Sequence, residues 1–106
     1  MKEKHIIEIH SDVRIDTRMI IDRKIIRHFA INVAIIQENG DTEDVFRVDT
    51  AHKGLHKMRF WISAEPEYIE KTRKENYTND FNEWAKIVDE NFASWAKTYK
   101  RKKGLS

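Results

Sequence analysis

The segment Arg47–Arg59 holds the densest group of side chains that could carry out chemistry. Its thirteen residues include two histidines, one aspartate, two lysines and two arginines. Histidine titrates near neutral pH, and cationic side chains stabilise the charge that develops on a phosphate. We therefore expect metal-independent cleavage of RNA in which His52 or His56 is the general base or acid. Lys57 and Arg59 should hold the phosphate, and Arg47 with Asp49 should fix the geometry.

The same segment allows two other interpretations. Asp49 can simply pair with a neighbouring arginine in a charged hairpin whose histidines flank a turn. Asp49, His52 and His56 also form a D-x-x-H-x-x-x-H pattern of oxygen and imidazole donors for a divalent ion. That spacing brings the histidines together only on a helix, and Gly54 disfavours one there. We expect no metal and, because the usual nucleotide and hydrolase motifs are missing, no cofactor.

Basic residues in this segment and at the end of the chain indicate that the protein binds nucleic acid. Neutralising phosphates releases counterions, and aromatic rings stack on bases, so cations beside an exposed tryptophan suit RNA. At the end of the chain, the alternative is a helix end whose cations complement the helix dipole. The candidate nucleic-acid-binding residues are Lys53, Lys57, Arg59, Trp61, Lys100, Arg101, Lys102 and Lys103.

A hairpin must position these side chains. Asn39-Gly40 suits the two central positions of a type I′ turn between β-rich runs at residues 25–37 and 43–50. With those two residues as the loop, the register pairs Ile36 with Glu43, Val33 with Phe46, Asn32 with Arg47, Ile31 with Val48 and Ala30 with Asp49.

Alternation along the strands sorts the side chains between two faces. The core face should carry Phe29, Ile31, Val33, Ile35, Phe46 and Val48, and the polar face should carry Ala30, Asn32, Ala34, Arg47 and Asp49. A third strand, residues 55–62, should add Met58, Phe60 and Ile62 to the core face and Lys57, Arg59 and Trp61 to the polar face. Alternation in the first 21 residues predicts one or two further strands.

The pattern changes to helical after residue 63. Pro66 and two pairs of opposite charge at i,i+4 spacing predict a short helix from about residue 65 to 75. A longer helix should begin with Asp80 as its N-cap. Its apolar stripe, which should cover the core face of the sheet, is Phe81, Trp84, Val88, Phe92, Trp95 and Tyr99.

Composition limits the class of protein. The 106 residues carry 20 Lys plus Arg against 18 Asp plus Glu, with 40% hydrophobic residues and no Cys. We expect one α+β domain over residues 1–99, with an antiparallel sheet of three to five strands and a C-terminal amphipathic helix packed on one face, followed by a basic tail at 100–106. The missing cysteines and the absence of a long apolar run predict a cytoplasmic protein without a membrane segment.

The segment Phe46-Arg47-Val48-Asp49-Thr50-Ala51-His52, followed by His56 and a basic residue, resembles the R-x-D-x-A-H...H segment of small prokaryotic proteins like the TumE toxins of toxin–antitoxin pairs. The resemblance implies a small α+β protein from a toxin or defence locus that acts on RNA, with Arg47, Asp49, His52 and His56 carried over. Lys57 and Met58 stand where a further histidine is common in that family.

Two functions follow from these observations. The first is a toxin- or defence-type protein that binds RNA and cleaves it without metal. The alternative is a non-catalytic phage or defence-system regulatory module, for example a CRISPR-associated one, that binds protein or nucleic acid. The expected partners are RNA or another nucleic acid, an antitoxin or defence-complex protein, and a second copy of the chain in a homodimer.

Overall fold

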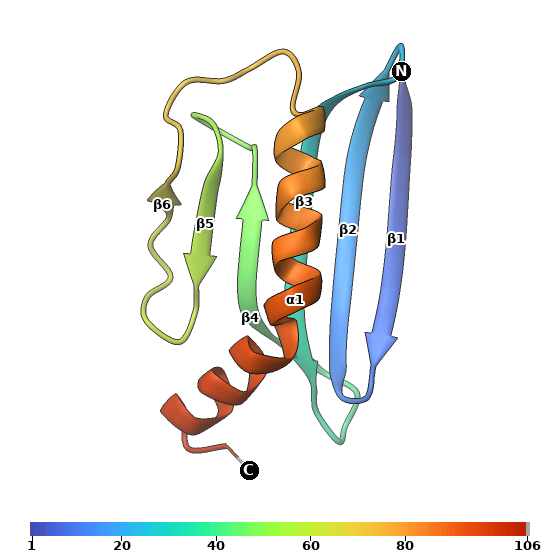
Figure 1. Ribbon diagram of the computed structural model, residues 1–106. Coiled ribbons are helices and arrows are strands. Elements are labelled where there is room, and N and C mark those ends of the chain that lie inside the picture. Colours follow the sequence, from blue (N-terminus) through green and yellow to red (C-terminus); the bar gives the residue numbers. More distant parts are fainter. Residues whose placement is uncertain (106) are drawn as a thin grey trace.

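Six strands that follow one another along the chain form one antiparallel sheet in the computed structural model, which describes residues 1–105 (Figure 1). The α+β class is as predicted, but the sheet has one strand more than the upper end of the predicted range. The strands are β1 (Lys2–His10), β2 (Val13–Asp22), β3 (Ile25–Ile36), β4 (Thr42–Asp49), β5 (His56–Arg59) and β6 (Glu67–Tyr68).

The first two hairpins turn on charged or polar residues. Ser11 has φ 58° between β1 and β2, and Arg23 and Lys24 have φ 53° and 67° between β2 and β3. Two successive residues of positive φ are typical of a tight hairpin turn, although Asn and Gly usually supply them. Because neither turn carries that signature, the sequence did not locate these two hairpins.

The third hairpin differs from its predicted register near the turn. Gln37 N–H donates to the Asp41 carbonyl at 2.7 Å, so the loop contains three residues instead of two. Ile36 therefore pairs with Thr42, and the predicted pairing of Ile36 with Glu43 is wrong. A bulge at Val45 restores the register, and the predicted pairs from Val33–Phe46 to Ala30–Asp49 are confirmed.

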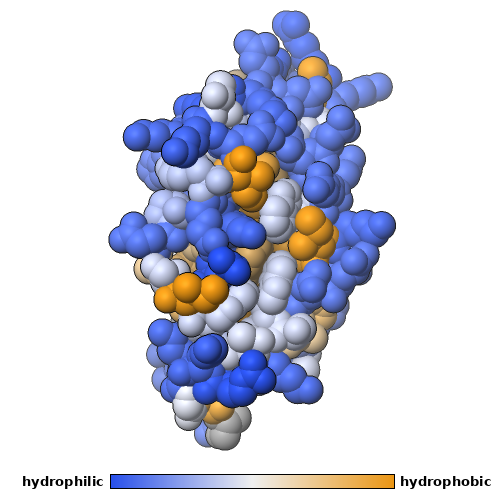
Figure 2. Space-filling model, turned by 60° about the vertical axis from the view of Figure 1, so that its left-hand side comes forward, coloured by the Kyte–Doolittle hydropathy of each residue, from blue (hydrophilic) through white to orange (hydrophobic). Residues whose placement is uncertain are grey.

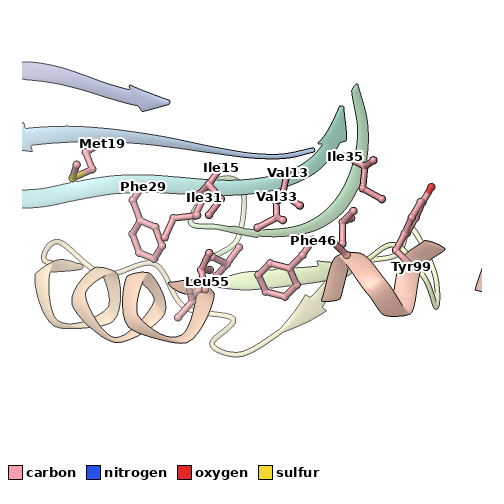
Figure 3. Packing of buried hydrophobic residues seen from close by; sticks show 14 of the residues in the cluster. Val13, Ile15, Met19, Phe29, Ile31, Val33, Ile35, Phe46, Leu55 and Tyr99 are labelled. Atoms are coloured by element: carbon pink, nitrogen blue, oxygen red, sulfur yellow. The ribbon is translucent and has the colours of Figure 1, made fainter. Parts of the chain in front are cut away.

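One face of this sheet is covered by α1 (Thr78–Lys102). The helix runs along β3 and also contacts β4 and β2 (Figure 1). In Figure 3, apolar side chains of the sheet point toward the helix, and Phe29, Val33 and Phe46 lie between the two layers. The predicted core face and the predicted helix stripe both contribute to this core, with Val88 and Tyr99 buried and the aromatic residues of the stripe partly buried against it.

The helix begins earlier than predicted. Its first residue is Thr78, whose N–H donates to Asn76 Oδ1 at 3.0 Å. Asp80 is therefore not the N-cap. It lies in the first turn, where its carboxylate is 3.2 Å from Lys74 Nζ and favourably placed against the helix dipole.

The helix predicted for residues 65–75 is absent, and β6 and an irregular segment occupy that range. Ile69 and Glu70 donate their N–H groups to the Leu55 carbonyl at 2.9 and 3.1 Å, which ties the segment to the start of β5. The Glu70–Lys74 ion pair does form, at 2.8 Å. Exposed pairs of this kind stabilise a helix only weakly, so tertiary contacts decide the conformation.

The surface in Figure 2 is mainly hydrophilic, with hydrophobic residues in small separate patches. No helix within residues 1–105 combines the length and the apolar character needed to cross a membrane.

Candidate functional site

The face of the sheet opposite α1 is open: nothing else within residues 1–105 packs across it as the helix does across the other face (Figure 1). Strand pairing aligns its side chains in two rows across the strands. The first row is His5, Arg18, Ala30, Asp49, His56 and Tyr68. The second row is Ile7, Asp16, Asn32, Arg47 and Met58.

Small residues on β3 leave space between the larger side chains of these rows. Three adjoining hollows of about 500, 390 and 280 Å³ lie along the open face, and Arg47 lines all three. Ala30 lines the largest and the smallest, because its methyl group leaves room between Arg18 and Asp49. The hollows therefore follow the open face from β1 to β6.

Arg47 and Asp49 form an ion pair on β4. Arg47 Nε and Nη2 lie 2.9 and 2.8 Å from Asp49 Oδ2, while the N–H of Ala51 donates to Asp49 Oδ1 at 2.5 Å. Asp49 is only 6% exposed, so its charge needs these partners. This carboxylate thus orients the guanidinium and fixes the start of the loop after β4.

His56 faces Asp49 from β5. Its ring is almost fully buried beside Tyr68, with the ring centroids 5.4 Å apart. Nδ1 lies 2.9 Å from the Gly54 carbonyl, which can only accept, so Nδ1 carries the proton. Neutral His56 therefore has its lone pair on Nε2.

His52 stands in the loop between β4 and β5, residues 50–55. It is exposed and adopts φ 63°, a left-handed conformation that few residues other than glycine take. Its side chain lines two of the three hollows. Gly54 closes the loop with φ 144°, and a Cβ there would lie 2.5 Å from the Glu70 carbonyl oxygen.

The four predicted catalytic residues thus line a single hollow, that of about 390 Å³. Among residues 1–105, no group of three or more His, Asp or Glu side chains is placed to hold one metal ion together, so Asp49, His52 and His56 do not form the alternative metal site.

Further cations border the largest hollow, and the sequence pattern did not single them out. Arg18 is 59% exposed at its side chain and lies 3.6 Å from Asp16. Arg73 comes from the irregular segment after β6, with Nη2 3.3 Å from His28 Nε2. Alternation along the second strand could have placed Arg18 on this face, but no local signal brings Arg73 to it.

In β5, which corresponds to the strand predicted at residues 55–62, the side chains lie on the opposite faces of the sheet from those predicted. Met58 pairs with Arg47, and β5 ends at Arg59, so the predicted place of Met58 in the core is wrong. Lys57 and Arg59 lie on the helix side: Lys57 Nζ is 5.9 Å from the centroid of a Trp84 ring.

Trp61 and Ile62 also differ from their predicted positions. Trp61 is partly buried and stacks on Trp95, with centroids 6.4 Å apart, so it does not lie beside Arg47 on the polar face. Ile62 is 60% exposed and not part of the core. Alternation divides a strand into two sets, but only the pairing partner decides which set faces the core.

The other predicted cations lie in two places. Lys53 is exposed beside His52. The C-terminal cations lie at the other end of the sheet, because α1 runs away from the β4–β5 loop (Figure 1). Lys100 pairs with Asp12, and Lys103 Nζ is 5.8 Å from the Tyr99 ring centroid. Arg101 and Lys102, like Lys103, are exposed.

The six-stranded meander, its covering helix and its open polar face define an α+β protein with one exposed side of the sheet. The chain belongs to the family described as Domain of unknown function (DUF7718), which matches residues 1–105. No curated protein and no solved structure matches the chain.

Proposed function

We propose that the open face binds RNA and that His52 and His56 cleave it without metal, as a toxin- or defence-type protein would. One observation carries the proposal: Arg47, Asp49, His52 and His56 line the same hollow. The resemblance of the segment around them to TumE-like toxins points in the same direction.

The arginines of the open face bind the RNA phosphate in this proposal. Arg18, Arg47 and Arg73 line the largest hollow, and the ion pair with Asp49 holds Arg47 in place. A guanidinium fork matches two phosphate oxygens. The lining of this hollow also includes Ile20 and Ala30, apolar side chains that a base could contact.

Cleavage needs two proton transfers. Attack of the RNA 2′-hydroxyl on the adjacent phosphorus forms a new P–O bond and breaks the bond to the 5′-oxygen. A base removes the hydroxyl proton and an acid protonates the leaving oxygen. His56, with its lone pair on Nε2, is suited to be the base, and His52 in the exposed loop is suited to be the acid. Arg47 stabilises the charge on the phosphorus oxygens.

The test is cleavage of a labelled single-stranded RNA by the full chain in the presence of EDTA. His52→Ala combined with His56→Asn should lower the rate by about a hundredfold or more. Asparagine keeps a donor for the Gly54 carbonyl but cannot titrate. His10→Ala, which removes a histidine from the helix side of the sheet, should leave the rate unchanged.

The matched DNA oligonucleotide lacks the attacking hydroxyl and should stay intact. Equal cleavage of RNA by wild type and by the folded double variant would sink the catalytic proposal. Circular dichroism of each variant establishes that it has folded before its rate is compared.

A non-catalytic nucleic-acid-binding module is the second candidate. It is favoured by the exposed cations Lys97, Arg101 and Lys102 at the end of α1, at the other end of the sheet from the β4–β5 loop (Figure 1). Under that alternative, Arg101→Glu with Lys102→Glu abolishes RNA binding, whereas Arg18→Ala with Arg73→Ala leaves it intact.

A further inference from the structure

We infer that β1 pairs with the β1 strand of a second copy of this chain, joining two sheets edge to edge. The observation is an uncovered edge: all nine residues of β1 are exposed, and the outer side of the strand faces no other element within residues 1–105 (Figure 1). Ile7 and Ile9 are 48% and 63% exposed. A long exposed edge strand with apolar side chains is a template for another strand.

The backbone groups of this edge point outward in a regular pattern. The two-residue turn Ser11-Asp12 is closed by His10 opposite Val13, so even-numbered residues of β1 bond to β2. The odd-numbered residues therefore direct their N–H and C=O groups outward. Those residues are Glu3, His5, Ile7 and Ile9.

Self-pairing about Ile6 uses the whole strand. An antiparallel twofold pairing centred on Ile6 places residue 2 opposite residue 10, so all nine residues find a partner. The odd-numbered residues then face each other and form about eight backbone hydrogen bonds. Shifting the centre to residue 5 or 7 leaves strand ends unpaired.

Charge complementarity selects the same register. With Ile6 at the twofold axis, Lys4 of each copy lies directly opposite Glu8 of the other. Oppositely charged cross-strand pairs stabilise a sheet and like charges destabilise it. Lys4 has no ion pair within residues 1–105, and the exposed Glu8 carboxylate contacts only His10, at 3.1 Å. Centring on His5 would instead set Lys4 against Ile6.

Apolar contact at the axis adds to this pairing. Ile6 lies on the helix side of the sheet, where it borders a hollow with Phe81 and Ala85. Bringing the two copies of Ile6 together extends the edge of the existing core. The twofold axis stands perpendicular to the sheet, so both helices lie on one side and both open faces on the other.

The dimer does not depend on the proposed function, because self-association is measured without RNA. We expect sedimentation of the wild-type chain at low salt to show a concentration-dependent rise from 12.7 kDa toward twice that mass. Lys4→Glu alone, or Glu8→Lys alone, should raise the dissociation constant by about tenfold or more, since each creates two like-charge pairs.

Mixing the two single variants provides the specific test. In a mixed dimer, the copy with carboxylates at both positions faces the copy with ammonium groups at both, so a 1:1 mixture should recover association. The matched controls Lys86→Glu and Glu90→Lys change the same charges at exposed positions of α1 and should behave as wild type. A wild-type chain that stays monomeric at millimolar concentration contradicts the inference and leaves the edge to a strand of a different protein. A mixture that associates no better than its components contradicts the inference as well.

Discussion

At Gly54 a single hydrogen atom in place of a side chain allows the candidate site to form. The φ of 144° suits glycine, and the backbone of residues 70–72 packs against its Cα. The contact joins the loop that carries His52 to the segment that carries Arg73. The geometry of the open face therefore depends on a residue that lines none of the three hollows.

Gly54→Ala tests this dependence. We expect it to lower the free energy of unfolding by about 3 kcal/mol, because alanine strains the backbone and its Cβ would meet the Glu70 carbonyl oxygen. Gly40→Ala is the control: φ is 90° and nothing lies within 4 Å of its Cβ, so about 1 kcal/mol is expected. Urea unfolding measures both, and equal losses would contradict the packing argument.

Arg73 is predicted to contribute a phosphate contact. Arg73→Ala should reduce the dependence of RNA affinity on salt, lowering the slope of log K against log salt by about one. Lys97→Ala, an equal change of charge on α1, should leave the slope unchanged. Fluorescence anisotropy at several salt concentrations gives both slopes, and a larger effect at Lys97 would favour the helix end.

At the scale of the elements, an ion pair joins β6 to β5 at one edge of the sheet. Arg59 donates two hydrogen bonds to Glu67, at 2.8 and 2.6 Å, and so fastens the short β6 to β5. The hydrogen bond from Arg59 lowers the pKa of Glu67 below its ordinary 4.5. The stabilisation is therefore present above pH 4.5 and is lost as the pH falls through the lowered value.

Glu67→Gln should remove that dependence. Both side chains are more than a third exposed, so solvent screening limits the loss at pH 7 to at most about 1 kcal/mol. Below the pKa of Glu67 the two proteins should unfold at the same urea concentration. Glu83→Gln, at an exposed position of α1, controls for the general effect of removing a carboxylate. A difference that persists once the pH is below the lowered pKa of Glu67 would contradict the ion-pair account.

The elements differ in how far their sequences determine them. The stripe from Phe81 to Tyr99 predicted α1 because a long amphipathic period specifies both a helix and its buried side. The side chains of β5 were assigned to the wrong faces of the sheet. The register of β5 depends on its pairing with β4 and on the loop of residues 50–55 that joins the two strands. Residues 65–75 carry helical charge spacing, but bonds to Leu55 override that weak preference.

The residues of the candidate site also differ in how far the sequence could place them. Arg47, Asp49, His52 and His56 lie within ten residues of one another, so a hairpin was enough to bring them together. Their neighbours Arg18 and Arg73 are separated from them in the chain and meet only in the folded sheet. No local sequence pattern indicates that residues from distant segments of the chain lie close together in the fold.

In the whole molecule, one face of the sheet packs against the helix and the other face is open. The helix side holds the buried core, while the open side holds the charged rows and their hollows. Pairing of two copies through the exposed β1 edge extends the open side. The C-terminal cations lie apart from it, at the end of α1.

The most direct test of the open face is an NMR titration of the ¹⁵N-labelled chain with a short single-stranded RNA. We predict that the amide signals of residues 47–56, His28 and Ala30 shift together, while those of residues 97–103 stay in place. Shifts confined to residues 97–103 would contradict the account and assign RNA binding to the helix end.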